Sequence, residues 1–243
     1  NQTGCAVALQ LGIAPDEDRP AVGRALASLV RTANGRVATG FLGTPLVLPA
    51  LAATGHFGEA YLMLFRRESP SWLYQVAQGA TTVWERWDAI RPDGSIHDGR
   101  MAPNPVDPDG REGHMLSFNH YAYGAVVDWM YRHVAGIAPD RADPGYRHVV
   151  VAPRPAAGLA WARASVETER GRVAIEWRVA EHELELELEL PAGSNATVRP
   201  PVTERSSVSL DGQPAAGELA LSPGRHTVVV TAPAIANPHR VRS

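Results

Sequence analysis

The segment from Pro70 to Asp88 holds the residues best suited to chemistry. It carries three of the six tryptophans of the chain, Trp72, Trp84 and Trp87, together with the carboxylate of Glu85. Aromatic faces stack on the C–H groups of a sugar, while carboxylates and amides bind its hydroxyls. A carboxylate beside indole rings is also partly desolvated, which makes it a stronger base. The segment is therefore typical of a sugar-binding site with a reactive carboxylate.

An alternative interpretation of this segment needs no ligand. The tryptophans would then belong to the core, and Glu85 would pair with Arg86 at the surface. Composition alone does not decide between the two. If Glu85 is a catalytic base, Asp88 is not the matching acid. In inverting glycosidases the acid and base carboxyl groups are ~6.5–9.5 Å apart, and carboxylates three residues apart in the sequence lie closer than that. The partner acid must come from elsewhere.

A second segment, Ser117–Ala125, places His120 among aromatic residues where a helix is predicted to begin. His120 could donate a hydrogen bond to a ligand hydroxyl, or it could cap the helix and pack. The other histidines are scattered, with no HExxH motif and no His/Cys/Asp cluster, so neither a metal site nor a cofactor is predicted. The stretch Asp107–Gly110 resembles a calcium loop, but Pro108 and the missing downstream glutamate favour an exposed turn.

Composition excludes several classes of protein. The 243 residues are 44% hydrophobic and 20% charged, with a net charge of -3, which is typical of a globular chain. All 23 basic residues are arginine, without a concentrated basic face, so no nucleic-acid partner is predicted. The lone Cys5 rules out an internal disulfide. No apolar run reaches the ~18 residues of a membrane helix, which predicts a soluble protein without a membrane partner.

The beginning of the chain suggests that something precedes it. The first residues, Asn1–Leu9, have helix-like composition, with neither a methionine nor a basic leader. We therefore expect a C-terminal piece of a longer protein, whose compartment the sequence does not specify.

The first part of the chain has the periodicity of helices. Apolar residues recur at three- and four-residue spacing over Ala21–Val30, after Pro20 in a first-turn position. Further helices are predicted over Thr44–Ala53, Phe57–Phe65 and Ala122–Val134, the last ended by Gly136. Helices joined by loops suggest stacked helical hairpins.

The period changes to two from about Tyr146. Strands are predicted over His148–Ala152, Arg172–Trp177, Glu183–Leu190 and Thr227–Val230. In Glu183–Leu190, Glu and Leu alternate without a fault, so one face should be buried and the other solvated. Turn signals at short intervals fit an antiparallel β-sandwich.

A Pro/Asp-rich stretch, 139–145, marks the expected boundary between the two regions. The predicted fold class is thus multidomain, α then β. A helical domain is expected over 1–138 and a β-sandwich over 146–235.

Several strings together resemble the C-terminal part of bacterial α-L-rhamnosidases of glycoside hydrolase family 78. The most specific are Gly79–Trp87, which reads GATTVWERW, and Ser117–Gly124, which reads SFNHYAYG. The strings TGFLGT at 39–44 and PSWLY at 70–74 match as well, so the resemblance covers nearly the whole chain.

The resemblance implies the end of an (α/α)6 barrel followed by a C-terminal β-sandwich. It implies hydrolysis of terminal α-L-rhamnosyl residues with inversion, from a rhamnosylated glycoside or polysaccharide. Glu85 matches the general base of the family and His120 a sugar-contacting residue; Trp72, Trp84 and Trp87 are further candidates for substrate binding. The general acid of the family lies in an upstream motif that this chain lacks, so an upstream segment of the same enzyme is an expected partner and the chain alone should be inactive. The stretch 97–116 looks longer than the usual connection.

A function of another class is also compatible with the sequence. The chain could be a non-catalytic carbohydrate-binding fragment, with a sugar-stacking helical surface and a sandwich module. The two hypotheses differ in whether a segment bearing the acid belongs to the parent protein.

Overall fold

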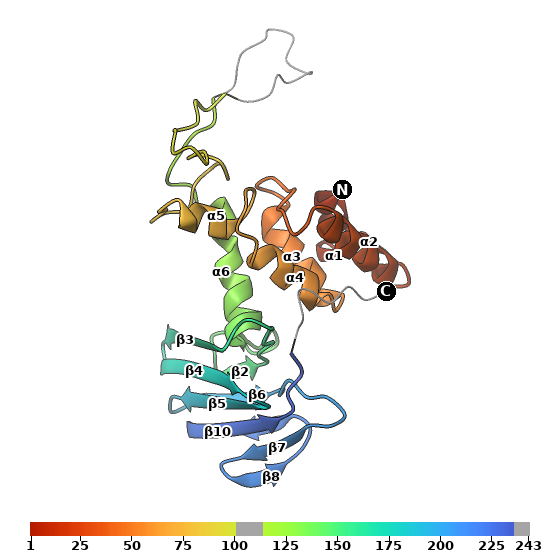
Figure 1. Ribbon diagram of the computed structural model, residues 1–243. Helices are drawn as coiled ribbons and strands as arrows, with labels where there is room; N and C mark the ends of the chain where they lie inside the picture. Colours follow the sequence, from red (N-terminus) through yellow and green to blue (C-terminus); the bar gives the residue numbers. More distant parts are fainter. Residues whose placement is uncertain (101–113, 236–243) are drawn as a thin grey trace. The chain divides into compact units, whose positions relative to one another are not determined.

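A computed structural model describes residues 1–100 and 114–235. The chain divides into two compact units, Asn1–Val126 and Val127–Asn237. Helices make up the regular structure of the first unit, and strands dominate the second (Figure 1). The predicted fold class, a helical region followed by β-sheets, is confirmed.

The helices of the first unit are short, and one of them, α3, lies at the centre of their packing. α3 contacts α1, α2 and α4. Apolar side chains from these helices are fully or almost fully buried, including Leu9, Leu26, Val30, Leu48, Leu51 and Met63. Burial of each such side chain stabilises the fold by about 1.5–3 kcal/mol. The helices are α1 (Gln2–Gln10), α2 (Arg19–Thr32), α3 (Thr44–Ala53), α4 (Phe57–Leu64) and α5 (Trp72–Ala77).

Local signals set the ends of these helices much as predicted. The predicted helix Thr44–Ala53 has the bounds of α3, and the prediction Phe57–Phe65 ends one residue beyond α4. Gly23 in α2 allows a close approach, since a Cβ there would lie 2.6 Å from Cβ of Thr54. A side chain at position 23 would therefore push α2 away from the end of α3.

The region after α5 is irregular. Two isolated bridges, Ile90 with Ile96 and Arg100 with His114, are its only β-pairings within the described residues. The long stretch 97–116 noted in the sequence lies largely outside the described residues, as does the calcium-like loop Asp107–Gly110.

The helix predicted over Ala122–Val134 forms with three hydrogen-bond patterns. A 3₁₀ turn, η1 (Tyr121–Ala125), leads into α6 (Val126–Trp129), and a π-helix, η2 (Met130–Ala135), follows. Gly136 ends the helix in the left-handed region, at φ 95°, as predicted. A Cβ at this position would lie 2.4 Å from the nitrogen of Pro153, so only glycine fits.

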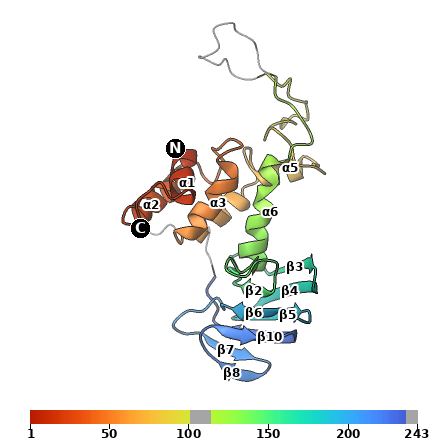
Figure 2. The ribbon, with the colours of Figure 1, turned by 180° about the vertical axis from the view of Figure 1, so that it is seen from behind.

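The second unit contains two sheets. Six antiparallel strands lie side by side in the larger sheet, as Figures 1 and 2 show, in the order β3-β4-β5-β10-β7-β8. These strands are β3 (Trp161–Thr168), β4 (Gly171–Ala180), β5 (Glu183–Leu190), β10 (Gly224–Thr231), β7 (Ser207–Leu210) and β8 (Gln213–Ala215).

The smaller sheet departs from the antiparallel prediction at one pair. Its order is β1-β2-β6-β9, and β2 pairs with β6 in parallel. β1 also begins before the expected boundary near Tyr146, because Ile137 is buried and pairs with Val151. Three residues are too few to show a period in the sequence. The domain limits 1–138 and 146–235 stay a prediction. The strands are β1 (Ile137–Pro139), β2 (His148–Val151), β6 (Asn195–Val198) and β9 (Leu219–Leu221).

Buried and exposed residues alternate along the strands, and the buried ones form the core of this unit. Every leucine of β5 is buried, while its glutamates, Glu189 apart, are exposed, which confirms the predicted two-faced strand. Trp177 on β4 is fully buried, and its Nε1 donates to the carbonyl oxygen of Val134 at 2.8 Å. This bond ties η2 to the larger sheet.

Candidate active site

Two segments far apart in the sequence lie side by side in the first unit. The backbone N–H of Glu85 donates to the carbonyl oxygen of Ser117 at 2.9 Å, and that of His120 donates to Val83 at 2.7 Å. The hydroxyl of Thr82 adds a bond to the carbonyl oxygen of Phe118. These bonds pair the string around Glu85 with the string around His120, although about 35 residues separate them. The two residues proposed to face a sugar are therefore held by one backbone framework.

The carboxylate of Glu85 has no hydrogen bond or ion pair with any described residue. Its neighbour Arg86 binds Asp88 instead, with Nε 3.1 Å from Oδ1, and its Nη2 lies 3.1 Å from Nε2 of His97. The Glu85–Arg86 pair of the alternative interpretation is thus absent from the described contacts. Glu85 itself is half-buried. An unpaired carboxylate at such a position can accept a proton from water.

Aromatic side chains pack around these strings. The ring of Trp87 stacks on Tyr123, with centroids 4.0 Å apart, and meets the ring of Trp72 edge-on at 5.5 Å. Nε1 of Trp72 donates to the carbonyl oxygen of Tyr123 at 2.9 Å. Trp84 contacts Phe118 edge-on at 5.4 Å. The aromatic cluster fixes the position of the chain on both sides of Glu85.

The burial of these tryptophans bears on their expected role. Trp84 is 3% exposed and Trp87 is 8% exposed, so both pack as core residues of this unit. Trp72 is half-buried. A substrate contact by Trp72, Trp84 or Trp87 stays a prediction. Nε1 of Trp87 is buried without a hydrogen-bond partner among the described residues.

His120 performs the capping role that the sequence allowed. It precedes η1, and its Nδ1 accepts from the backbone N–H of Ala122 at 3.4 Å. Its ring stacks on Phe41, with centroids 4.5 Å apart and planes 15° apart. A neutral imidazole that accepts at Nδ1 carries its proton on Nε2. Nε2 has no hydrogen-bond partner among the described residues, so it can donate to a ligand.

A buried amide side chain forms a hydrogen bond with the backbone next to Glu85. Gln75 on α5 is 5% exposed, and its Nε2 donates to the carbonyl oxygen of Arg86 at 3.1 Å. Ser71 caps the same helix by accepting from the N–H of Tyr74 at 3.2 Å. Sequence reasoning did not single out Gln75; the only signal was an amide within an aromatic helix. Gln75 thus fixes the peptide between Arg86 and Trp87, one residue after Glu85.

The phenol of Tyr123 reports the electrostatics of the site. Burial raises the pKa of Tyr123, the positive charge of Arg86 opposes the rise, and the negative charges of Glu85 and Asp88 add to it. The phenol therefore stays neutral at physiological pH. Tyr123 can stack and donate a hydrogen bond, but it cannot serve as a base.

The described residues hold no group of three His, Cys, Asp or Glu side chains that could bind a metal ion. Within the same residues, no helix is both long and apolar enough to cross a bilayer.

Two family models match consecutive parts of the chain. The model of the bacterial alpha-L-rhamnosidase 6 hairpin glycosidase domain matches residues 1–134, and that of the bacterial alpha-L-rhamnosidase C-terminal domain matches residues 136–214. The fold and the two models thus define a helical-hairpin glycosidase region followed by its C-terminal β domain. The chain belongs to the bacterial α-L-rhamnosidase family. The resemblance seen in the sequence is confirmed.

Curated relatives extend the match. An alpha-L-rhamnosidase of Streptomyces avermitilis is 41% identical over 197 residues, covering 81% of this chain and 18% of the relative. One of Formosa agariphila is 35% identical over 212 residues, covering 87% of this chain and 21% of the relative. The chain thus spans about a fifth of the length of these relatives.

Solved structures agree with the fold. The Streptomyces avermitilis α-L-rhamnosidase complexed with L-rhamnose superposes with a TM-score of 0.80 at 36% identity, covering 95% of this chain and 22% of that one. The enzyme of Aspergillus terreus gives a TM-score of 0.77 at 32% identity, covering 93% and 23%.

Proposed function

We propose that this chain supplies the general base and one sugar-contacting residue of an inverting α-L-rhamnosidase. In this proposal Glu85 accepts a proton from the water that attacks the anomeric carbon, and Nε2 of His120 donates to a sugar hydroxyl. The observation that carries the proposal is the unpaired carboxylate of Glu85, fixed by backbone bonds to the segment that bears His120. The relatives named alpha-L-rhamnosidase and the strings that match the family support it.

The rest of the catalytic site belongs to an upstream segment of the same enzyme. Leaving-group protonation needs a second carboxylate on the opposite face of the sugar, about 6.5–9.5 Å from the base. We propose that the upstream segment provides this acid and that the natural substrate is a rhamnosylated glycoside or polysaccharide. The chain alone should therefore lack turnover.

The stereochemistry of the released sugar tests this proposal. The full-length enzyme should release β-L-rhamnose first from an aryl α-L-rhamnoside, as followed by proton NMR before mutarotation. Initial release of the α anomer would exclude inversion. Absence of hydrolysis in the full-length protein would favour the non-catalytic carbohydrate-binding function instead.

A further inference from the structure

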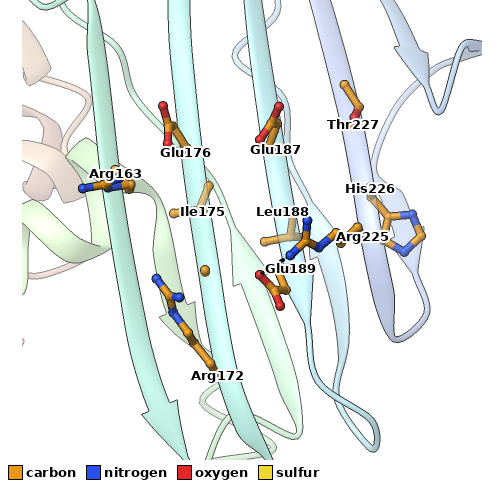
Figure 3. A pocket seen from close by; sticks show the side chains of 11 residues that line it. Arg163, Arg172, Ile175, Glu176, Glu187, Leu188, Glu189, Arg225, His226 and Thr227 are labelled. Atoms are coloured by element: carbon orange, nitrogen blue, oxygen red, sulfur yellow. Dashed lines mark ion pairs between the residues drawn. The ribbon is translucent and has the colours of Figure 1, made fainter.

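The solvated face of the larger sheet is hollowed, far in sequence from Glu85. The hollow has a volume of about 410 Å³ and lies over β3, β4, β5 and β10 (Figure 3). Three arginines and three glutamates line it: Arg163, Arg172, Arg225, Glu176, Glu187 and Glu189. Its size falls within the range of pockets that hold small ligands.

The hollow arises where two short side chains lie among long ones. Ala174 on β4 is paired with Ser165 on β3 and with Glu189 on β5. Arg225 continues this row on β10. Because Ala174 and Ser165 have short side chains, the longer side chains around them stand as walls.

Two of the glutamates that line the hollow lie next to each other, which lowers the stability of the sheet. Glu176 and Glu187 are direct cross-strand neighbours. Like charges in such a pair destabilise a sheet. Arg178 binds Glu176 and offsets part of this repulsion, but Glu187 has no hydrogen bond or ion pair with any described residue. A carboxylate that repels its neighbour and lacks a partner is available to a ligand.

A free cation faces the same hollow. Arg163 on β3 pairs in register with Glu176, yet no described residue forms an ion pair or hydrogen bond with its guanidinium. The other two arginines form ion pairs. Nη2 of Arg225 lies 3.6 Å from Oε2 of Glu189, and Nε of Arg172 lies 4.0 Å from Oε1 of Glu167. One unpaired donor group and one unpaired acceptor group therefore remain.

An exposed indole lies beside the hollow, next to one of the residues that line it. Trp161 is 57% exposed on β3, two residues from Arg163 and hence on the same face of the strand. Its register partner is Arg178. A solvated tryptophan offers a flat surface for the C–H face of a sugar ring.

We propose that this hollow is a second carbohydrate site, which binds a neutral stretch of a glycan chain. Glu187 accepts from hydroxyls, Arg163 donates to hydroxyl or ring oxygens, and Trp161 stacks on a ring. The equal numbers of arginines and glutamates favour an uncharged polyhydroxyl ligand over an anionic one. The proposal rests on the proposed function only for the kind of glycan, which would be the remainder of the rhamnose-bearing chain.

A titration of the 243-residue chain with a neutral α-L-rhamnose tetrasaccharide at millimolar concentration tests the site. NMR of the indole N–H signals should show a saturable shift at Trp161. Arg163→Ala and Glu187→Gln should each weaken binding at least tenfold. Glu183→Gln, on the same face of β5 but outside the hollow, is the matched control and should leave binding unchanged. Hydrogen exchange of β3–β5 in the full-length Glu85→Gln variant, which should hardly hydrolyse the sugar, with and without the same tetrasaccharide, gives the second measurement.

Each outcome decides the matter separately from Glu85. No shift at Trp161 and no protection of β3–β5, or equal loss in the Glu183→Gln control, would overturn the proposal. Preferential binding of an oligogalacturonate of the same length would replace the neutral glycan by an anionic one and overturn it too. Glu85→Gln should not change this binding, so a failure here leaves the proposed function untouched, and the reverse holds as well.

Discussion

The paired strings of the helical unit and the charged face of the larger sheet use the same residue types differently. Around Glu85, tryptophans are buried and the backbone is fixed by bonds to a distant segment. On the sheet, Trp161 is exposed and the glutamates stand on a regular strand lattice. The first arrangement holds one carboxylate in place, as a proton-transfer step needs. The second presents several groups at once, which suits binding along a chain. Residue type alone therefore does not define a site. What matters is how the surrounding backbone and side chains hold those residues.

Glu85→Gln in the full-length enzyme is the largest expected effect. Loss of a general base should lower kcat by about 10²–10⁴-fold, because water is then activated only by solvent. The kcat for aryl rhamnosides with good leaving groups should fall as much as the kcat for those with poor leaving groups, because protonation of the leaving group is intact. Steady-state kinetics measure this. Glu17→Gln, an exposed glutamate in the same unit, is the control and should behave as wild type. Near-normal turnover in Glu85→Gln would remove the distinction between the two regions.

Leu186→Ala tests whether the sheet is a rigid platform. Leu186 is 1% exposed in the middle of β5, so truncation should cost about 2–5 kcal/mol of unfolding free energy. Glu185→Ala, on the opposite face of the same strand, should change stability little. Denaturant unfolding followed by circular dichroism gives both values. A cost below about 1 kcal/mol for Leu186→Ala would mean that this face is not tightly packed.

His120→Ala separates the two roles of that histidine. If Nε2 binds a hydroxyl, the variant should lower kcat/KM by about 10–100-fold, because the hydroxyl of the bound sugar then loses its one donor and stays unpaired. It should also weaken inhibition by rhamnose. His120→Asn, which can still cap η1, should restore stability without restoring rhamnose affinity. Unchanged product inhibition in the alanine variant would leave only the capping and packing role.

His133 gives the smallest effect and concerns the sheet unit. Burial is the main cause that lowers the pKa of His133 to about 4; the positive charges of Arg154 and Arg132 act in the same direction, and the negative charge of Asp128 opposes them. The unfolded state, with an ordinary pKa near 6.5, binds the proton first. Stability should therefore fall as pH drops from about 6.5 to 4, by about 1–2 kcal/mol after allowance for partial solvent access. His133→Gln should flatten this dependence; an unchanged slope in His133→Gln would contradict the assignment.

The sequence predicted most of the elements whose period is long enough to read, although the eight-residue strand β3 was missed. The ten residues of α3 and the eight of β5 were predicted with the observed bounds, because local pattern and tertiary burial agree there. The three-residue strands β8 and β9 were not predicted, since so short a run shows no period. The parallel pairing of β2 with β6 depends on segments about 45 residues apart and leaves no local signal.

The candidate site was predicted in part for the same reason. The strings around Glu85 and His120 could be singled out by composition and by resemblance. Their pairing through Ser117 and Val83 required the fold. The burial of Trp84 and Trp87 likewise depends on Phe118 and Tyr123, which come from the other string. The support from Gln75 reaches across a turn of irregular chain and could not be read locally.

Chemical rescue of Glu85→Ala in the full-length enzyme tests the central claim most directly. Azide needs no deprotonation, so it can attack from the space that the carboxylate occupied and restore turnover of an aryl α-L-rhamnoside. The product should be the β-L-rhamnosyl azide, identified by NMR, and Glu17→Ala should give no azide adduct. An α-configured adduct, or no gain in turnover with azide, would contradict the assignment of Glu85 as the general base.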